Sequence, residues 1–102
     1  MSVSEVASSR SVQHIQAYPN PSARPVIQFS LPQRRDVTLE VFDVAGRLVQ
    51  RTGLGILNPG PVEALFDGAG RSAGVYLYRL KLVDPETRVE QASPYGKLVL
   101  LK

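Results

Sequence analysis

Apolar and polar residues alternate with a period of two along most of the chain. This pattern predicts β-strands, because successive side chains of a strand point to opposite faces. Glycines and prolines, eight of each, interrupt the alternation at short intervals. The expected strands are His14–Tyr18, Pro25–Leu31, Asp36–Val44, Leu48–Arg51, Val62–Phe66, Gly74–Val83 and Lys97–Lys102. A spacing of roughly ten residues between strands is typical of antiparallel sandwiches, so we predict an all-β, immunoglobulin-like sandwich of about seven strands.

The alternation also predicts which side chains form the core. The apolar residues expected to point inward are Ile27, Phe29, Leu31, Val37, Leu39, Val41, Val62, Ala64, Phe66, Tyr76, Tyr78, Leu80 and Leu82. The polar residues expected to point outward into solvent include Thr38, Glu40, Arg79 and Lys81. Phe42 adds apolar surface to an outward face, and Tyr76 is a candidate for a tyrosine corner because it lies near the start of its strand.

Two kinds of connection are expected between the strands. Asp43–Arg47 predicts a tight hairpin, because Asp43 can accept hydrogen bonds from nearby amides and Gly46 can adopt a positive φ. Gly53–Pro61, with three glycines and two prolines, predicts a loop. The segment Asp84–Tyr95 begins with a turn and is compatible with either a hairpin arm or a loop.

The last residues of the chain are unusually apolar. Leu98–Leu101 lie between Lys97 and Lys102. Keeping one large aliphatic side chain out of a core costs about 1.5–3 kcal/mol, so this segment is expected either to close a sheet or to be held for a partner. As a strand, it would point Leu98 and Leu100 inward and the residues between and after them outward.

Composition indicates one folded domain with a polar extension. At 102 residues the chain is long enough to bury a core. The serine-rich segment 1–13 predicts a flexible linker, and 14–102 is the expected domain. The net charge of +3 is spread without a basic stripe, which favours a solubilising surface over a nucleic-acid interface. No apolar stretch approaches the ~20 residues of a membrane helix, and segment 1–13 lacks the apolar region of a signal peptide.

The residues offer little catalytic or metal-binding chemistry. Cysteine is absent, and the single histidine, His14, has no carboxylate or serine close to it in sequence. Asp84 and Glu86 are too few for a calcium loop, and the remaining acidic residues fall mainly in turns or on outward strand faces. We therefore expect no enzyme activity, no cofactor and no metal. Phe42 and Tyr95 are the aromatic residues left as candidates for an exposed binding platform.

A series of short motifs resembles one known family in order and spacing. The motifs are Tyr18–Pro21, Val26–Pro32, Val37–Arg47, Gly74–Leu80 and Lys97–Lys102. Together they resemble the C-terminal sorting domain of proteins exported by the type IX secretion system of the Bacteroidetes, which is related to the immunoglobulin-like domain of flagellar hook-capping proteins. Phe66 stands where many members carry tryptophan, and the connection from Asp84 to Tyr95 is longer than usual.

The resemblance implies a sorting signal rather than a catalyst. The implied partners are the outer-membrane translocation machinery, a sortase-like protease and a cargo domain attached before the sorting domain. The protein would pass through the periplasm to the cell surface or the medium. The expected recognition residues are Lys97, Leu98, Val99, Leu100, Leu101 and Lys102. The residues of the structural motifs are Tyr18, Pro19, Asn20, Pro21, Asp43, Gly46, Arg47, Gly74, Tyr76 and Tyr78.

Two other functions are compatible with the same pattern. A carbohydrate-binding or cell-attachment module of a secreted enzyme would use an aromatic patch around Phe42 and Tyr95. A structural spacer or hook-cap-like assembly piece would need only a well-paired terminal strand.

Overall fold

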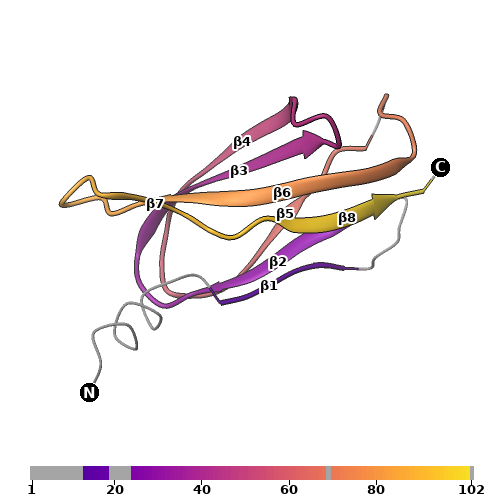
Figure 1. Cartoon of the computed structure of the whole chain (residues 1–102). Coiled ribbons are helices and arrows are strands. Elements are labelled where there is room, and N and C mark those ends of the chain that lie inside the picture. The colour runs from indigo at the N-terminus through magenta and orange to yellow at the C-terminus, as the bar shows by residue number, and fades with distance from the viewer. Residues whose placement is uncertain (1–12, 19–23, 69, 102) are drawn as a thin grey trace, which may run out of the picture.

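The computed structural model describes residues 13–18, 24–68 and 70–101, and these form eight antiparallel strands in two sheets (Figure 1). The three-stranded sheet has the order β1 (Gln13–Tyr18), β2 (Val26–Leu31) and β5 (Gly60–Leu65). The five-stranded sheet contains β4 (Leu48–Leu57), β3 (Arg35–Asp43) and β6 (Gly74–Val83), followed by β7 (Glu90–Ala92) and β8 (Gly96–Leu100), both paired to β6. The predicted all-β sandwich is confirmed. In the part of the chain that the structure describes, no helix is long and apolar enough to cross a membrane.

The core lies between the two sheets and consists of the residues that point inward, at every second position along the strands. It contains Ile27, Phe29, Leu31, Val37, Leu39, Val41, Ala64, Phe66, Tyr76, Tyr78, Leu80, Leu82, Leu98 and Leu100, all of them buried. Twelve of the thirteen residues that the alternation placed inward in the earlier strands belong to it, as do the two terminal leucines, whereas Val62 is only partly buried against the core. The period-two pattern therefore identifies the strands that supply these fully buried side chains.

The loop predicted over Gly53–Pro61 is wrong. β4 continues to Leu57, and β5 already begins at Gly60. The strand persists because β3 is long enough to pair with it, from Arg35 opposite Leu57 onward. An irregularity in this pairing between Val37 and Thr38 accommodates the glycines, which serve as a β-bulge rather than a loop.

The segment Asp84–Tyr95 resolves the open alternative in favour of a hairpin arm. The Asp84 side chain accepts hydrogen bonds from the amides of Glu86 and Thr87, at 2.9 and 3.2 Å, and these two amides hold the pKa of Asp84 below its usual value. The chain then returns as β7, a strand additional to the seven expected, which brings the number of described strands to eight. At the other end of the molecule, β1 begins at Gln13, one residue before the expected domain boundary, while the rest of the expected linker lies outside the described residues.

Candidate partner-recognition site

Residues 97–100 of the expected recognition segment lie in β8, which lies beside β6 near the C-terminal end of the described chain (Figure 1), and Leu101 follows the strand. In the five-stranded sheet, β8 pairs with β6. The structure therefore brings two sequence motifs together, since the Gly74–Leu80 motif lies within β6. The paired residues are Gly74 with Leu100, Tyr76 with Leu98, and Tyr78 with Gly96.

The inner face of β8 is packed tightly into the core. Leu98 and Leu100 are fully buried, as the alternation predicted, whereas Leu101 is exposed. Gly96 is in such close contact with the Tyr78 ring that a Cβ atom at Gly96 would lie 2.3 Å from Cζ of that ring. Only glycine fits at this end of β8, so the Tyr78 ring fixes the position at which the strand begins.

A one-residue offset separates the registers of β7 and β8 along β6. In β7, Ala92 pairs with Lys81, and in β8, Gly96 pairs with Tyr78. From Lys81 to Tyr78, β6 advances by three residues, whereas the opposite chain advances by four, from Ala92 to Gly96. The extra residue forms a β-bulge around Pro94. A one-residue offset reverses which side chains point inward, so this bulge sets the inward positions of β8.

Ser93 and Tyr95 flank this bulge, and their side chains point to opposite faces of the sheet. Ser93 is buried and stays paired with Leu80: its amide donates to the Leu80 carbonyl at 2.8 Å, and its hydroxyl accepts from the Leu80 amide at 2.8 Å. Tyr95 instead lies on the outer face of the sheet, where its ring centroid is 5.3 Å from the Arg79 guanidinium carbon. The bulge thus delivers an aromatic side chain to the outside of the five-stranded sheet.

The hairpin motif has the predicted geometry. The Asp43 carboxylate accepts hydrogen bonds from the amides of Ala45 and Arg47 at 2.9 and 3.0 Å, and Gly46 has a φ of 85°. The Arg47 amide, and after it the Arg47 side chain at 2.8 Å, hold the pKa of Asp43 below its usual value. Asp43 pairs with Tyr76 in the sheet, which places the hairpin motif next to the β6 motif.

The two tyrosines of the β6 motif connect separate parts of the fold. The Tyr76 hydroxyl donates to the Ser72 carbonyl at 2.6 Å, four residues upstream, which is the bond expected of a tyrosine corner. Tyr78 extends across the core and is hydrogen-bonded to the backbone of Ala17 in β1; burial raises the pKa of its phenol. Both residues stabilise the strand against which β8 packs.

Glu40 corrects the prediction that it is solvated. It points outward from β3 but is only 2% exposed. Arg79 donates to its Oε1 at 2.9 Å, while Arg51 donates to Oε2 from Nε and Nη2, at 3.2 and 3.0 Å. Burial acts to raise the pKa of Glu40, but the hydrogen bonds and charges of the two arginines outweigh it, and the pKa lies below the ordinary value of 4.5.

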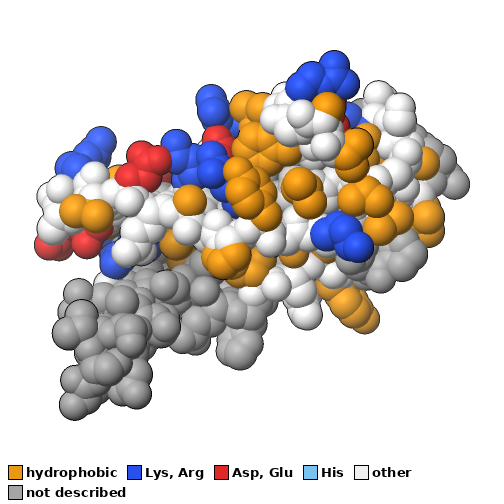
Figure 2. All heavy atoms as spheres, viewed as in Figure 1, with side chains coloured by type: hydrophobic (Ala, Val, Ile, Leu, Met, Phe, Trp, Pro, Cys, Tyr) orange, Lys and Arg blue, Asp and Glu red, His pale blue; other side chains and the backbone are white. Residues whose placement is uncertain are grey.

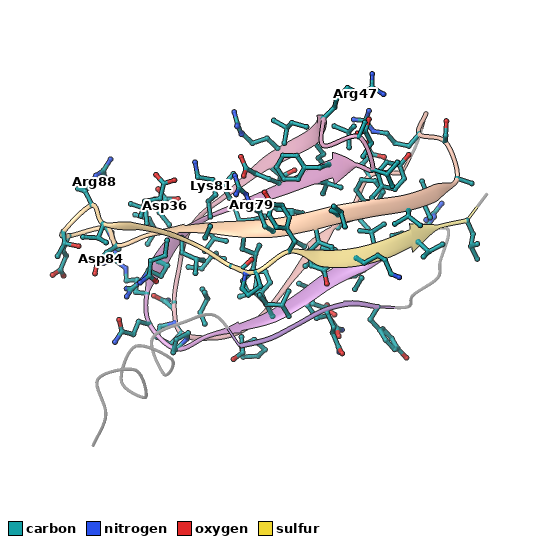
Figure 3. The ribbon with its side chains drawn as sticks, in the orientation of Figure 1. Asp36, Arg47, Arg79, Lys81, Asp84 and Arg88 are labelled. Carbon is teal, nitrogen blue, oxygen red and sulfur yellow. The ribbon has the colours of Figure 1, made fainter. Side chains whose placement is uncertain are left out.

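The two candidate platform residues also come together on this outer face. The Phe42 and Tyr95 rings lie 5.8 Å apart at an angle of 67°, and Arg79 contacts both rings. Figure 3 shows the position of Arg79 on β6. Rings at this angle do not form the flat surface on which a sugar stacks. The sequence signals for this cluster were Phe42, which breaks the polar pattern of its face, and Tyr95, which follows Pro94. Their proximity to Glu40 and its arginines was missed, because it depends on pairing between distant strands.

Comparison with known protein families identifies this arrangement. The sequence model of the family described as "Secretion system C-terminal sorting domain" matches residues 16–89, which is more than half of the chain. The chain belongs to this family. The sorting domain is a C-terminal signal of type IX secretion, which directs an attached cargo protein across the outer membrane to the cell surface or the medium. Domains of this family are sorting signals rather than catalysts. The match ends at Val89, so β8 lies beyond it.

A solved structure has the same fold as the sorting domain. The crystal structure of dimeric latent PorU from Porphyromonas gingivalis superposes with a TM-score of 0.70 at 23% sequence identity. The superposition covers 85% of the sorting domain and 9% of the PorU chain. At this identity the similarity establishes the fold. Comparison with curated proteins finds no match.

The predicted site residues therefore fall into two groups. Three motifs meet on neighbouring strands: the Asp43–Arg47 hairpin, the Gly74–Tyr78 part of β6, and residues 97–101 in and just after β8. Tyr18 ends β1, in the other sheet, and its side chain is exposed. Pro19, Asn20, Pro21 and Lys102 lie outside the described residues.

Proposed function

We propose that the translocation machinery recognises the sorting domain through its terminal strand, residues Lys97–Lys102. The observation that carries this proposal is the contrast in burial along the segment: β8 is held against β6 with Leu98 and Leu100 in the core, while Leu101 directly after it is exposed. A partner can recognise an extended segment through the side chains that point away from the core.

The difference in burial between β8 and the residue that follows it supports this mechanism. Leu98 and Leu100 are buried and hold the strand in place, so the segment keeps an extended conformation without a partner. Leu101 remains 46% exposed and available for contact. A strand that is already extended loses less conformational entropy on binding than a disordered tail would.

The rest of the proposed pathway concerns the attached cargo. The cargo would precede residue 1 and be joined through the polar segment 1–13, where a sortase-like protease would cleave after export. Serine-rich segments of this kind are typical cleavage sites, because a protease needs an accessible, extended substrate. The protein would cross the periplasm before reaching the cell surface or the medium.

An export assay tests the role of the terminal strand. The chain is fused to the C-terminus of a periplasmic reporter in a type IX-competent host, and the exported fraction is measured. Leu101→Glu is expected to reduce export at least fivefold, since it places a charge on the outward face of the terminal segment. The matched control is Leu65→Glu, which makes the same change at an exposed leucine of β5 and should export normally.

The outcome depends on the folded state of each variant. Circular dichroism and thermal unfolding of the purified domain should show that Leu101→Glu and Leu65→Glu fold like the wild type. Equal export of the two variants would contradict recognition through the terminal strand. Deletion of 98–102 is uninformative in this assay because it also removes two core leucines. Mass spectrometry of the exported reporter should locate the new C-terminus before or within residues 1–13.

A further inference from the structure

The outer face of the five-stranded sheet carries a continuous group of apolar side chains. Strand pairing places them side by side: Leu48 opposite Phe42, Phe42 opposite Leu77, and Val75 opposite Val99. Tyr95 joins the group through its contact with the Phe42 ring. We call this group the apolar patch; its members are Phe42, Leu48, Val75, Leu77, Tyr95 and Val99.

The apolar patch is accessible to a partner. Figure 2 shows hydrophobic side chains gathered over the β3, β6 and β8 part of this view, with charged side chains of both signs toward the β7 end. Tyr95 is 57% exposed, Leu48 42% and Val75 39%. Contiguous apolar surface on the outward side of a sheet is uncommon in soluble domains and marks contact surfaces.

The charges beside the apolar patch indicate what kind of partner fits. Both carboxylate oxygens of Glu40 are engaged by arginines, and its side chain is 3% exposed, whereas the side chain of Arg51 is 61% exposed. Arg79, held between Glu40 and the two aromatic rings, remains partly exposed at 30%. An approaching molecule therefore meets cations next to apolar side chains, while the nearest carboxylate is hidden beneath them.

We propose that the apolar patch docks a protein segment that presents apolar side chains and a carboxylate, with the carboxylate binding Arg51 and Arg79. This inference rests on the proposed function, since the segment would belong to the export machinery that also recognises the terminal strand. Charge complementarity favours this partner, because a guanidinium already oriented by hydrogen bonds binds a carboxylate at little entropic cost. A second copy of the chain fits less well, since a symmetric pairing of two patches would bring their arginines together.

The reporter fusion tests the docking surface with matched variants. Leu48→Ser combined with Tyr95→Ser should lower the exported fraction at least fivefold, and Arg51→Gln should lower it severalfold. The controls make single changes of the same kind elsewhere: Leu65→Ser on the other sheet and Arg34→Gln in the exposed connection between β2 and β3 should export like the wild type. Each variant is first shown to be folded by thermal unfolding.

The possible results separate this inference from the proposed function. Normal export of the folded patch variants, alongside loss of export in Leu101→Glu, would overturn the docking surface and leave recognition through the terminal strand intact. Failure of the wild-type fusion itself to be exported would overturn both. Loss of export in the patch variants but not in the controls is the expected result.

A binding experiment on the purified chain examines the chemistry of the surface directly. The probe is 1-anilinonaphthalene-8-sulfonate, which is both apolar and anionic. We expect fluorescence titration to show binding by the wild type that weakens severalfold in Tyr95→Ser and in Arg51→Gln, and is unchanged in Leu65→Ser. Equal binding by all variants would contradict the inference.

Two further measurements test whether a second copy of the chain or a lipid surface covers the apolar patch instead. Sedimentation velocity should show a monomer at micromolar concentration; a dimer that Tyr95→Ser dissociates would overturn the proposal in favour of a second copy. Flotation with phosphatidylglycerol vesicles should show no binding; binding that Tyr95→Ser abolishes would overturn it in favour of a lipid surface.

Discussion

The two outer faces of the sandwich satisfy their polar groups in different ways. On the three-stranded sheet, the Gln16 amide donates to Gln28 at 3.0 Å, and the Gln28 amide donates to Glu63 at 2.8 Å, forming a ladder at the surface. On the five-stranded sheet, Arg51 and Arg79 enclose Glu40 beside the apolar patch. Glu63 therefore stays at the surface of one face, whereas Glu40 is buried on the other.

This difference shows that an outward position is not always a solvated one. An amide ladder can exchange its hydrogen bonds with water at little cost, so such a face needs no partner. On the other face, Glu40 is shielded from water by arginines, and apolar side chains are exposed to water. A partner that covers these side chains would bury apolar surface and could bind the arginines. We therefore assign docking to the five-stranded sheet and solvation to the three-stranded sheet.

The two sheets share one core, to which β8 contributes Leu98 and Leu100. The largest expected loss of stability therefore comes from a change at one of these leucines. Leu98→Ala should lower the free energy of unfolding by about 3 kcal/mol, since it removes buried methyl groups and leaves a cavity. Urea denaturation measures the change. Leu101→Ala, at an exposed position, should change it by less than about 0.5 kcal/mol. Equal effects would mean that β8 does not pack as described.

A matched pair of glutamates compares the two faces directly. Glu40→Gln should destabilise the domain by about 2 kcal/mol, because it weakens charge-assisted hydrogen bonds and leaves two arginines without their shared carboxylate. Glu63→Gln keeps the ladder geometry at the surface and should cost less than about 0.5 kcal/mol. Chemical denaturation at pH 7 measures both variants, and equal costs would remove the distinction between the faces.

The effect of pH sharpens the same comparison. The pKa of Glu40 is lowered in the folded state, so its contribution to stability is complete above its ordinary value of 4.5 and is lost as the pH falls through the folded-state pKa. The difference in unfolding free energy between wild type and Glu40→Gln should therefore shrink below pH 4.5. A difference that stays constant from pH 7 to pH 3 would show that the ionised carboxylate is not its source.

The smallest effect is expected on the three-stranded sheet. Gln28→Ala removes both hydrogen bonds of the ladder, but water replaces them, so stability should fall by no more than about 0.5 kcal/mol. Export of the reporter fusion should stay at the wild-type level. Reduced export of a folded Gln28→Ala variant would show that this face also takes part in recognition.

The sequence was sufficient to predict the core but not the surface. Alternation assigned residues such as Val37 and Leu80 to the inside, because burial on one face of a strand imposes a period of two. It could not predict the burial of Glu40, which depends on Arg51 and Arg79 from two other strands. The continuation of β4 past Gly53 was missed for a similar reason: the partner strand, not local composition, sustains it.

In the candidate site too, features set by local sequence were predictable, whereas contacts between strands were not. The terminal segment and its inward leucines followed from local pattern, and the resemblance linked them to the Asp43–Arg47 hairpin and the β6 motif. The meeting of Phe42 with Tyr95 did not follow, since it requires both the pairing of β3 with β6 and the bulge at Pro94. Contacts of this kind belong to the register of the sheet and not to any single strand.

The bulge at Pro94 determines how evolution or design can change the length of this region. Residues can be added or removed at the tip between Asp84 and Val89 without altering which side chains of β8 face the core. A single insertion or deletion beside Pro94 would instead exchange Leu98 and Leu100 with their neighbours and turn Tyr95 inward. Variation in length among related domains should therefore concentrate at the hairpin tip, and changes near Pro94 should occur in steps of two.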